Sequence, residues 1–184
     1  MTEVKILVEG YTSNNSNGEK TCPTITLIKD KSLNLVVDPG VLEDQKILID
    51  KLKENGLSIN DIDVVCITHS HIDHYRNVGM FPNAKTLEYF GLWHKNTVTD
   101  WEENFTDNIK IIKTPGHNYD GITLLVSTDI GVVAICGDVF WKEGYPENDP
   151  YASDKEKLEE SRIKVLQSAD FIIPGHAGIY KVKK

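Results

Sequence analysis

The chain has 184 residues, a length that suits one compact domain with a substantial buried core. Apolar residues make up 40% and charged residues 26%, a balance that excludes a disordered or fibrous protein. The formal net charge of −8 offers no diffuse attraction to nucleic-acid backbones, so such a contact would need a local basic patch or metal ions.

The N-terminus, MTEVKILVEGY, lacks the basic start and apolar middle of a secretory signal, and no apolar run reaches transmembrane length. Three cysteines, Cys22, Cys66 and Cys136, cannot all pair within one chain. We therefore expect a single domain over residues 1–184, in the cytoplasm and without membrane contact, whose cysteines are reduced core residues.

Short apolar runs predict strands. In chain order these are residues 4–10, 21–30, 33–40, 61–68, 84–90, 109–117, 122–129, 131–138 and 171–176. A tight turn at Lys31 and Ser32 joins the second and third of them into a hairpin. The polar, glycine-bearing stretch 11–20 predicts a loop that could lie over a site or simply flex.

Two stretches switch to a helical period. Residues 42–56 place Leu42, Ile47, Leu48 and Leu52 on one side, with Gly56 as the stop. Residues 152–170 have Ser153 as the expected cap, Asp154 and Glu156 in the first turn, and an apolar side formed by Leu158, Ile163, Val165 and Leu166. Helices on the outsides of two packed sheets would satisfy this order, which predicts a four-layer α/β sandwich.

Histidine or aspartate residues, which can bind metals, follow four of the predicted strands. Thr68 opens the cluster THSHIDH, and three other strands end in TPGH, CGD and PGH, at His117, Asp138 and His176. A single histidine is usually a surface or satisfied core residue, but four strand ends of this type predict side chains gathered at one edge of the scaffold.

A pair of metal ions would explain the crowding. A strand residue and its second neighbour point to the same side, so His69 and His71 can hold one ion together. Asp73 and His74 can then face a second ion. Two such cations repel unless a carboxylate lies between them, and Asp138 is the natural bridging group.

The motifs THSHIDH, TPGH, GD and PGH, in this order, resemble the metallo-beta-lactamase fold superfamily, and the VVDPG turn with Asp38 and Gly40 fits as well. The resemblance implies the αβ/βα fold and two zinc ions per chain, with iron or manganese as possible replacements. It implies one ion on His69, His71 and His117, a second on Asp73, His74 and His176, and Asp138 shared by both.

A closer likeness, carried by ILVEGY, HIDHYRNVGMFPNA, VAICGDVF and ESRIKVLQSADFIIPGH, is to the group that includes metallo-beta-lactamase domain-containing protein 1 and its short relatives. It implies a compact hydrolase, RNA cleavage among its activities, and a homodimer. The alternative substrate is a small ester, lactone or thioester. Persulfide dioxygenases share the ligand signature around a single iron, and a binding module without turnover is a further option.

In a two-zinc site a bridging hydroxide would attack the substrate, and Asp73 would orient it and relay its proton. A purely structural zinc site normally closes four ligands around one ion, so seven ligands favour catalysis.

His94 has no spaced partner and is expected on a surface loop. Trp93 and Trp101 are expected to pack in the interior, and Trp141 is close enough to Asp138 to line a cleft. Roles stay open for neighbours of the ligands and for cations that could meet a phosphate: Arg76, Tyr119, Lys95, Lys113 and Lys142.

Overall fold

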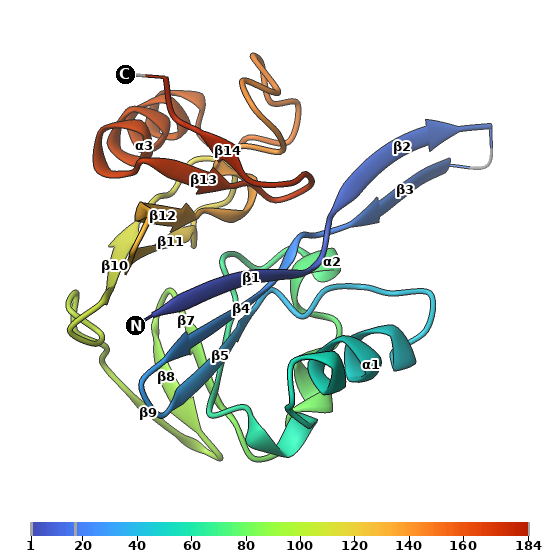
Figure 1. The fold of residues 1–184 in the computed structure, drawn as a ribbon. Helices are drawn as coiled ribbons and strands as arrows, with labels where there is room; N and C mark the ends of the chain where they lie inside the picture. Colours follow the sequence, from blue (N-terminus) through green and yellow to red (C-terminus); the bar gives the residue numbers. More distant parts are fainter. Residues whose placement is uncertain (1, 17, 184) are drawn as a thin grey trace.

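The computed structural model describes residues 2–16 and 18–183 and confirms the four-layer sandwich (Figure 1). One sheet has the strand order β1-β4-β5-β6-β7-β8-β9. Its strands are β1 (Glu3–Val8), β4 (Ile25–Asp30), β5 (Leu33–Val37), β6 (Val64–Cys66), β7 (Lys85–Glu88), β8 (Gly91–His94) and β9 (Thr97–Thr99). The other sheet has the order β10-β11-β12-β13-β14. Its strands are β10 (Ile109–Lys113), β11 (Ile122–Thr128), β12 (Gly131–Ile135), β13 (Phe171–Ile173) and β14 (Tyr180–Lys181).

The core lies between the two sheets because alternate residues of each strand face inward. On β5, Leu35 and Val37 point into this core with Ile111 of the second sheet, whereas Val36 points outward. The parallel pairs β5-β6-β7 and β12-β13 lie at the centres of the sheets. Strand ends that carry polar residues therefore meet at one edge, between the sheets.

One helix covers the outside of each sheet. Helix α1 (Lys46–Glu54) buries Leu48 and Leu52 against the first sheet. The expected stop, Gly56, follows it with a φ of +73°. Ile47, expected on the buried side, is 41% exposed, because it shares a face of the helix with Lys51 and not with Leu48 and Leu52. No helix among the described residues is both long and apolar enough to cross a membrane.

Helix α3 (Lys155–Ser168) differs from the predicted one at its cap and on its buried face. Asp154 is the N-cap and accepts a hydrogen bond from Lys157 N, whereas the Ser153 hydroxyl donates to Gly116 O. Leu158 and Val165 are buried as predicted, but Ile163 and Leu166 are exposed. Ser161 and Arg162 take their place on the buried face. The Arg162 guanidinium donates to three backbone carbonyls, Val139 O, Pro146 O and Glu147 O.

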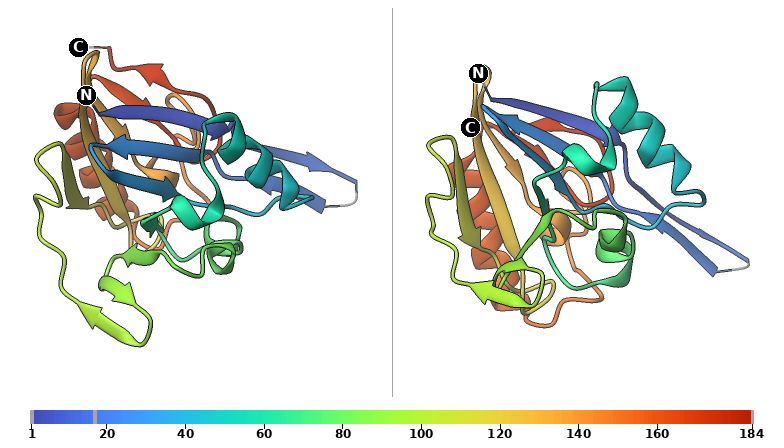
Figure 2. Two further views of the ribbon diagram at one scale, coloured as in Figure 1. Left: turned by 60° about the horizontal axis from the view of Figure 1, so that its bottom comes forward. Right: turned by 90° about the horizontal axis from the view of Figure 1, so that it is seen from below.

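Two segments taken as loops are strands. The polar stretch 11–20 belongs to a two-stranded ribbon, β2 (Tyr11–Asn15) and β3 (Gly18–Cys22), which extends beyond both sheets (Figures 1 and 2). Neither strand buries a face in the core, so no apolar alternation marks them in the sequence. Strand β8 carries His94 and pairs with β9. Three short helices, η1 (Ile59–Asp61), η2 (Val78–Met80) and η3 (Gly137–Val139), and α2 (Ile72–Tyr75) complete the described elements.

Candidate metal centre

The histidine cluster lies in the connection that follows β6. This strand ends at Cys66, two residues before the predicted end at Thr68, so His69 and His71 lie in a loop and do not have the strand geometry used to pair them. Asp73 and His74 are on the one-turn helix α2, for which His71 is the N-cap. The loop and the helix turn all four side chains toward the same region, so the expected convergence is reached by a different backbone.

The remaining predicted residues come from the second sheet. His117 lies in the loop after β10, Asp138 in η3 after β12, and His176 in the loop after β13. Gly137 has a φ of +51°, and a Cβ there would be 2.2 Å from the Thr68 hydroxyl oxygen. A Cβ on Gly175 would be 1.8 Å from Asp138 Oδ1. Glycine at these two positions therefore lets the chain carry Asp138 into the centre of the site.

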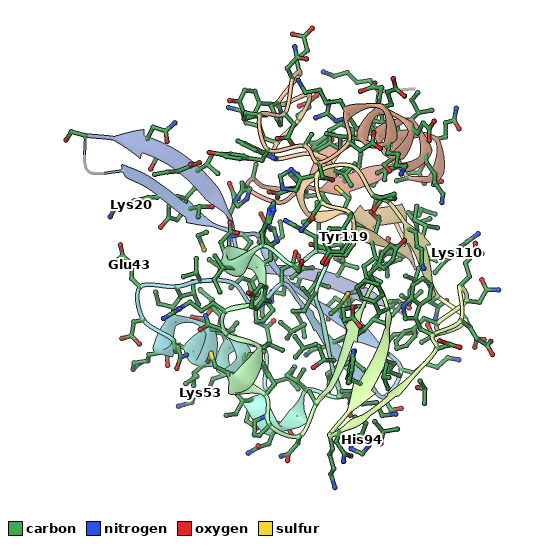
Figure 3. The ribbon with its side chains drawn as sticks, turned by 180° about the vertical axis from the view of Figure 1, so that it is seen from behind. Lys20, Glu43, Lys53, His94, Lys110 and Tyr119 are labelled. Carbon is green, nitrogen blue, oxygen red and sulfur yellow. The ribbon has the colours of Figure 1, made fainter. Side chains whose placement is uncertain are left out.

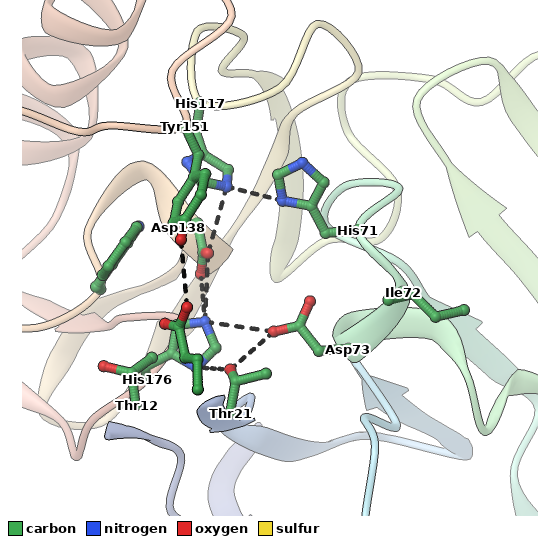
Figure 4. Close-up of a pocket in the computed structure, with 11 residues that line it drawn as sticks. Thr12, Thr21, His71, Ile72, Asp73, His117, Asp138, Tyr151 and His176 are labelled. Atoms are coloured by element: carbon green, nitrogen blue, oxygen red, sulfur yellow. Dashed lines mark hydrogen bonds and ion pairs between the residues drawn. The ribbon is translucent and has the colours of Figure 1, made fainter. Parts of the chain in front are cut away.

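All seven predicted side chains gather in two groups, within each of which the potential ligand atoms lie within 4.8 Å of one another. The first group is His69, His71, His117 and Asp138, and the second group is Asp73, His74 and His176. Figure 4 shows His71, His117, Asp138, His176 and Asp73 turned toward one another.

Asp138 lies between the two groups. Its Oδ2 is 3.4 Å from His117 Nε2, in the first group. Its Oδ1 is 3.3 Å from His74 Nε2 and 3.2 Å from His176 Nε2, in the second. One carboxylate thus faces both sets of ring nitrogens, which is the position expected of a shared ligand.

Hydrogen bonds on the opposite ring nitrogens orient the imidazoles. His74 Nδ1 is 2.8 Å from Asp38 Oδ2, and His117 Nδ1 is 2.6 Å from Asp149 Oδ2. His176 Nδ1 donates to the carbonyl oxygen of Cys22 at 2.9 Å. In each case Nε2 is left to face the centre, the arrangement typical of metal-ligating histidines.

Sequence reasoning gave Asp38 only as a turn landmark and missed Asp149. Asp38 also accepts hydrogen bonds from Thr68 N at 2.8 Å and from the Thr68 hydroxyl at 2.6 Å. It therefore ties the start of the histidine loop to His74. Asp149 follows no apolar strand, so nothing in the sequence pattern pointed to it.

Burial and neighbouring charges move the pKa values of the site in opposite directions. Burial lowers the pKa of His71 and holds that of His69 well below its usual value, so both imidazoles are neutral at pH 7. Burial opposes the charged form of His74 too, but Asp138 and Asp38 outweigh it and raise the pKa of His74 well above 6.5. Against burial, His74 and His176 hold the pKa of Asp138 well below its usual value. Neutral His69 and His71 and ionised Asp138 are in the forms that bind a metal, whereas His74 would have to release a proton on binding.

A metal fits the groups on structural grounds. His69 Nε2, His74 Nε2 and Asp138 Oδ1 are buried and form no well-aligned hydrogen bond among the described residues, although His74 Nε2 and Asp138 Oδ1 lie 3.3 Å apart. A buried polar atom without a partner costs free energy, typically about 1 to 3 kcal/mol. All three atoms face the same centre, where a cation would satisfy them.

The centre opens into a pocket of about 310 Å³. The ribbon β2-β3 forms part of its wall with Thr12, Glu19 and Thr21. Trp141 lines it as predicted and stacks on Tyr151, with ring centroids 5.7 Å apart. The stretch 11–20 was predicted as a loop that could lie over a site or simply flex; it is a ribbon, and its Thr12 and Glu19 line the pocket.

The other candidate residues lie elsewhere. His94 is exposed on β8, outside both groups, and Tyr119 is 62% exposed (Figure 3). Neither Arg76 nor Trp93 lines the pocket. The three lysines do not converge there: Lys113 packs over the Tyr89 ring, Lys142 packs over the Tyr145 ring, and Lys95 follows β8.

Comparison with known proteins finds relatives in the metallo-beta-lactamase superfamily. A family profile described as Metallo-beta-lactamase superfamily matches residues 23–97. Metallo-beta-lactamase domain-containing protein 1 of Xenopus laevis is 32% identical over 98% of this chain and 82% of its own length. The human protein of that name is longer, and the chain spans 59% of it. The closer likeness seen in the sequence is thus confirmed.

A "Probable metallo-hydrolase" of Methanocaldococcus jannaschii is 33% identical over 81% of this chain and 74% of its own length. Among solved structures, a Thermotoga maritima protein assigned to the metallo-beta-lactamases superposes with a TM-score of 0.78 at 26% identity, over 98% of this chain and 99% of its own. AidC, a dizinc quorum-quenching lactonase, shares the fold at 17% identity, with a TM-score of 0.69 over 91% of this chain and 78% of its own. The chain belongs to the metallo-beta-lactamase superfamily of metal-dependent hydrolases.

Proposed function

We propose that the protein is a dinuclear zinc hydrolase that acts on a small acyl substrate, such as a lactone, ester or thioester. The observation that carries this proposal is the position of Asp138 between two groups of ligand atoms at the base of a pocket of about 310 Å³. A pocket of this volume is at the lower end of the range for small-molecule sites.

The seven residues divide into two sets of ligands. The first group would hold one ion, the second group would hold the other, and Asp138 would be common to both. Imidazole nitrogens and carboxylate oxygens suit zinc. When bound, the ions would supply Lewis acidity and a lowered pKa for coordinated water.

Asp73 is the side chain we assign to proton transfer. Its carboxylate lines the pocket and keeps 16% of its side-chain surface exposed, whereas Asp138 keeps 6%. A partly exposed carboxylate that lines the pocket can accept a proton from attacking water and return it to the leaving oxygen or sulfur. Its Oδ2 is held by the Thr21 hydroxyl at 2.9 Å, so the group is oriented before substrate enters.

The pocket wall favours an uncharged acyl group. Ile72, Trp141 and Tyr151 contribute apolar and aromatic surface, and Glu19 adds a negative charge at the rim. No lysine or arginine lines this pocket among residues 2–16 and 18–183. Because the protein shares its fold with the lactonase AidC, a lactone is the first compound to test.

RNA cleavage, which the resemblance implies, stays a prediction, because two metals can clamp the attacking and leaving oxygens of a phosphodiester. Among the described residues, no lysine or arginine that could bind a phosphate lines the pocket, and this makes RNA the second candidate. A homodimer and a cytoplasmic location also stay predictions.

A parallel assay separates the two substrates. Zinc-loaded protein is offered N-hexanoyl-homoserine lactone, an aryl ester, an acyl thioester and single-stranded RNA. His71→Ala, which removes a ligand, is compared with His94→Ala, which removes an exposed histidine outside the site. We expect acyl hydrolysis that His71→Ala abolishes and His94→Ala retains. RNA cleavage with the same dependence, in the absence of acyl hydrolysis, would replace the acyl proposal.

A further inference from the structure

The end of strand β3 contacts two of the three side chains of the second group. The Thr21 hydroxyl donates to Asp73 Oδ2 at 2.9 Å and lies 3.4 Å from His176 Nδ1. The carbonyl oxygen of the next residue, Cys22, accepts the hydrogen bond from His176 Nδ1 at 2.9 Å. Figure 4 shows Thr21 between Asp73 and His176. Two successive residues of one strand thus orient two potential ligands that are distant in the sequence.

The chain around Thr21 is fixed on both sides. Beyond β3, Thr24 N donates to Gly175 O at 2.6 Å, and the Thr24 hydroxyl donates to Ala177 O at 2.8 Å, so this segment is joined to the residues on either side of His176. Two residues before Thr21, Glu19 points to the same side of the strand and accepts a hydrogen bond from the Tyr151 hydroxyl at 3.2 Å. Thr21 therefore reaches Asp73 from a backbone that is held in place.

We infer that Thr21 is a positioning residue for the second metal position, an inference that rests on the dinuclear site proposed above. Its hydroxyl holds Asp73 Oδ2, the oxygen that lies 3.7 Å from His176 Nε2 and 3.9 Å from His74 Nε2, and the Cys22 carbonyl holds the ring of His176. A group that orients a ligand in this way tunes both metal affinity and activity. The ribbon β2-β3 then has two roles: it lines the pocket, and it orients two of the candidate metal ligands.

The hydroxyl can be removed with little change of shape by Thr21→Val and kept by Thr21→Ser. Ser13→Ala, at an exposed position of the same ribbon, is the matched control. Metal-free protein is titrated with Zn²⁺ by isothermal calorimetry. We expect Thr21→Val to weaken the second equivalent by about 10- to 100-fold and to leave the first equivalent unchanged, as in comparable ligand-orienting variants. Thr21→Ser and Ser13→Ala should bind both equivalents as the wild type does.

A kinetic comparison on the best acyl substrate adds a second readout. Because Thr21 acts through Asp73, kcat should fall in Thr21→Val while KM stays close to that of the wild type, and Thr21→Ser should restore kcat. Thermal unfolding of the metal-free variants checks that each is folded. If Thr21→Val does not fold, Thr21→Ala removes the same hydroxyl without the added methyl group and has the same expected result.

Equal affinity of the wild type and Thr21→Val for the second equivalent would overturn this inference alone. Failure of Thr21→Ser to restore that affinity would also overturn it. A wild-type protein that takes up a single equivalent of zinc would overturn both this inference and the dinuclear proposal, so the two failures are distinguishable.

Discussion

Replacing Gly175 with alanine should damage the centre without touching a ligand. The new Cβ would be 1.8 Å from Asp138 Oδ1 and 3.0 Å from its Cγ, whereas real Cβ atoms keep at least 3.0 Å from such neighbours. The carboxylate or the loop must therefore move by about 1.2 Å, the difference between these two distances. A displacement of this size at a reacting centre costs roughly 100-fold in rate, and overpacking costs about 1 to 3 kcal/mol of stability.

The assay for this variant is metal content by mass spectrometry after dialysis, followed by the turnover of an acyl substrate. Gly178→Ala is the matched control on the same loop, since its Cβ would meet only the flexible, exposed end of Glu9, at 2.9 Å from Oε2. We expect Gly175→Ala to lose metal and about 99% of the activity, as the 100-fold estimate implies, and Gly178→Ala to keep both. Normal metal content and turnover in Gly175→Ala would refute the central position of Asp138.

Three further predictions follow from the surroundings of the site. Asp149→Ala should weaken zinc binding by about 10- to 100-fold, because it frees the His117 ring, and calorimetric titration measures this. Asp154→Ala should lower the free energy of unfolding by about 1 kcal/mol through loss of the α3 cap, measured in urea. Metal-free protein should be most stable near pH 6.5. Below pH 6.5 the His69 side chain takes up a proton in the unfolded chain but not in the folded one, because its pKa is lowered by burial. This difference lowers the free energy of unfolding. Above pH 6.5 the stabilising charge on His74 is lost as the pH rises through its raised pKa. Urea unfolding from pH 5 to 9 tests this, and stability that rises steadily from pH 6.5 to 9 would contradict it.

The layers of the fold were predictable because both sheets and α1 bury alternating or periodic apolar residues. The ribbon β2-β3 was not, since its polar strands have no buried face and only their backbone pairing defines them. Arg162 was missed on the buried face of α3 because its role depends on carbonyls of a distant loop, such as Pro146 O. In these places tertiary contacts, and not local pattern, decide the structure.

The candidate ligands were predictable because each follows an apolar strand in a short motif. The groups that orient them were harder to find. Asp149 meets His117 across 32 residues, and Thr21 meets Asp73 across 52, with no spacing rule to link either pair. His69 and His71 lie in the loop after β6 and not in strand geometry, and this loop brings their side chains into one group, whose role as metal ligands stays a prediction.

The most direct test of the account is a crystal structure of zinc-loaded protein with anomalous difference maps at the zinc and iron absorption edges. We predict two zinc peaks, one within each group, on either side of the Asp138 carboxylate. A single iron peak held by the first group alone would contradict the dinuclear proposal and favour the chemistry of a mononuclear iron enzyme.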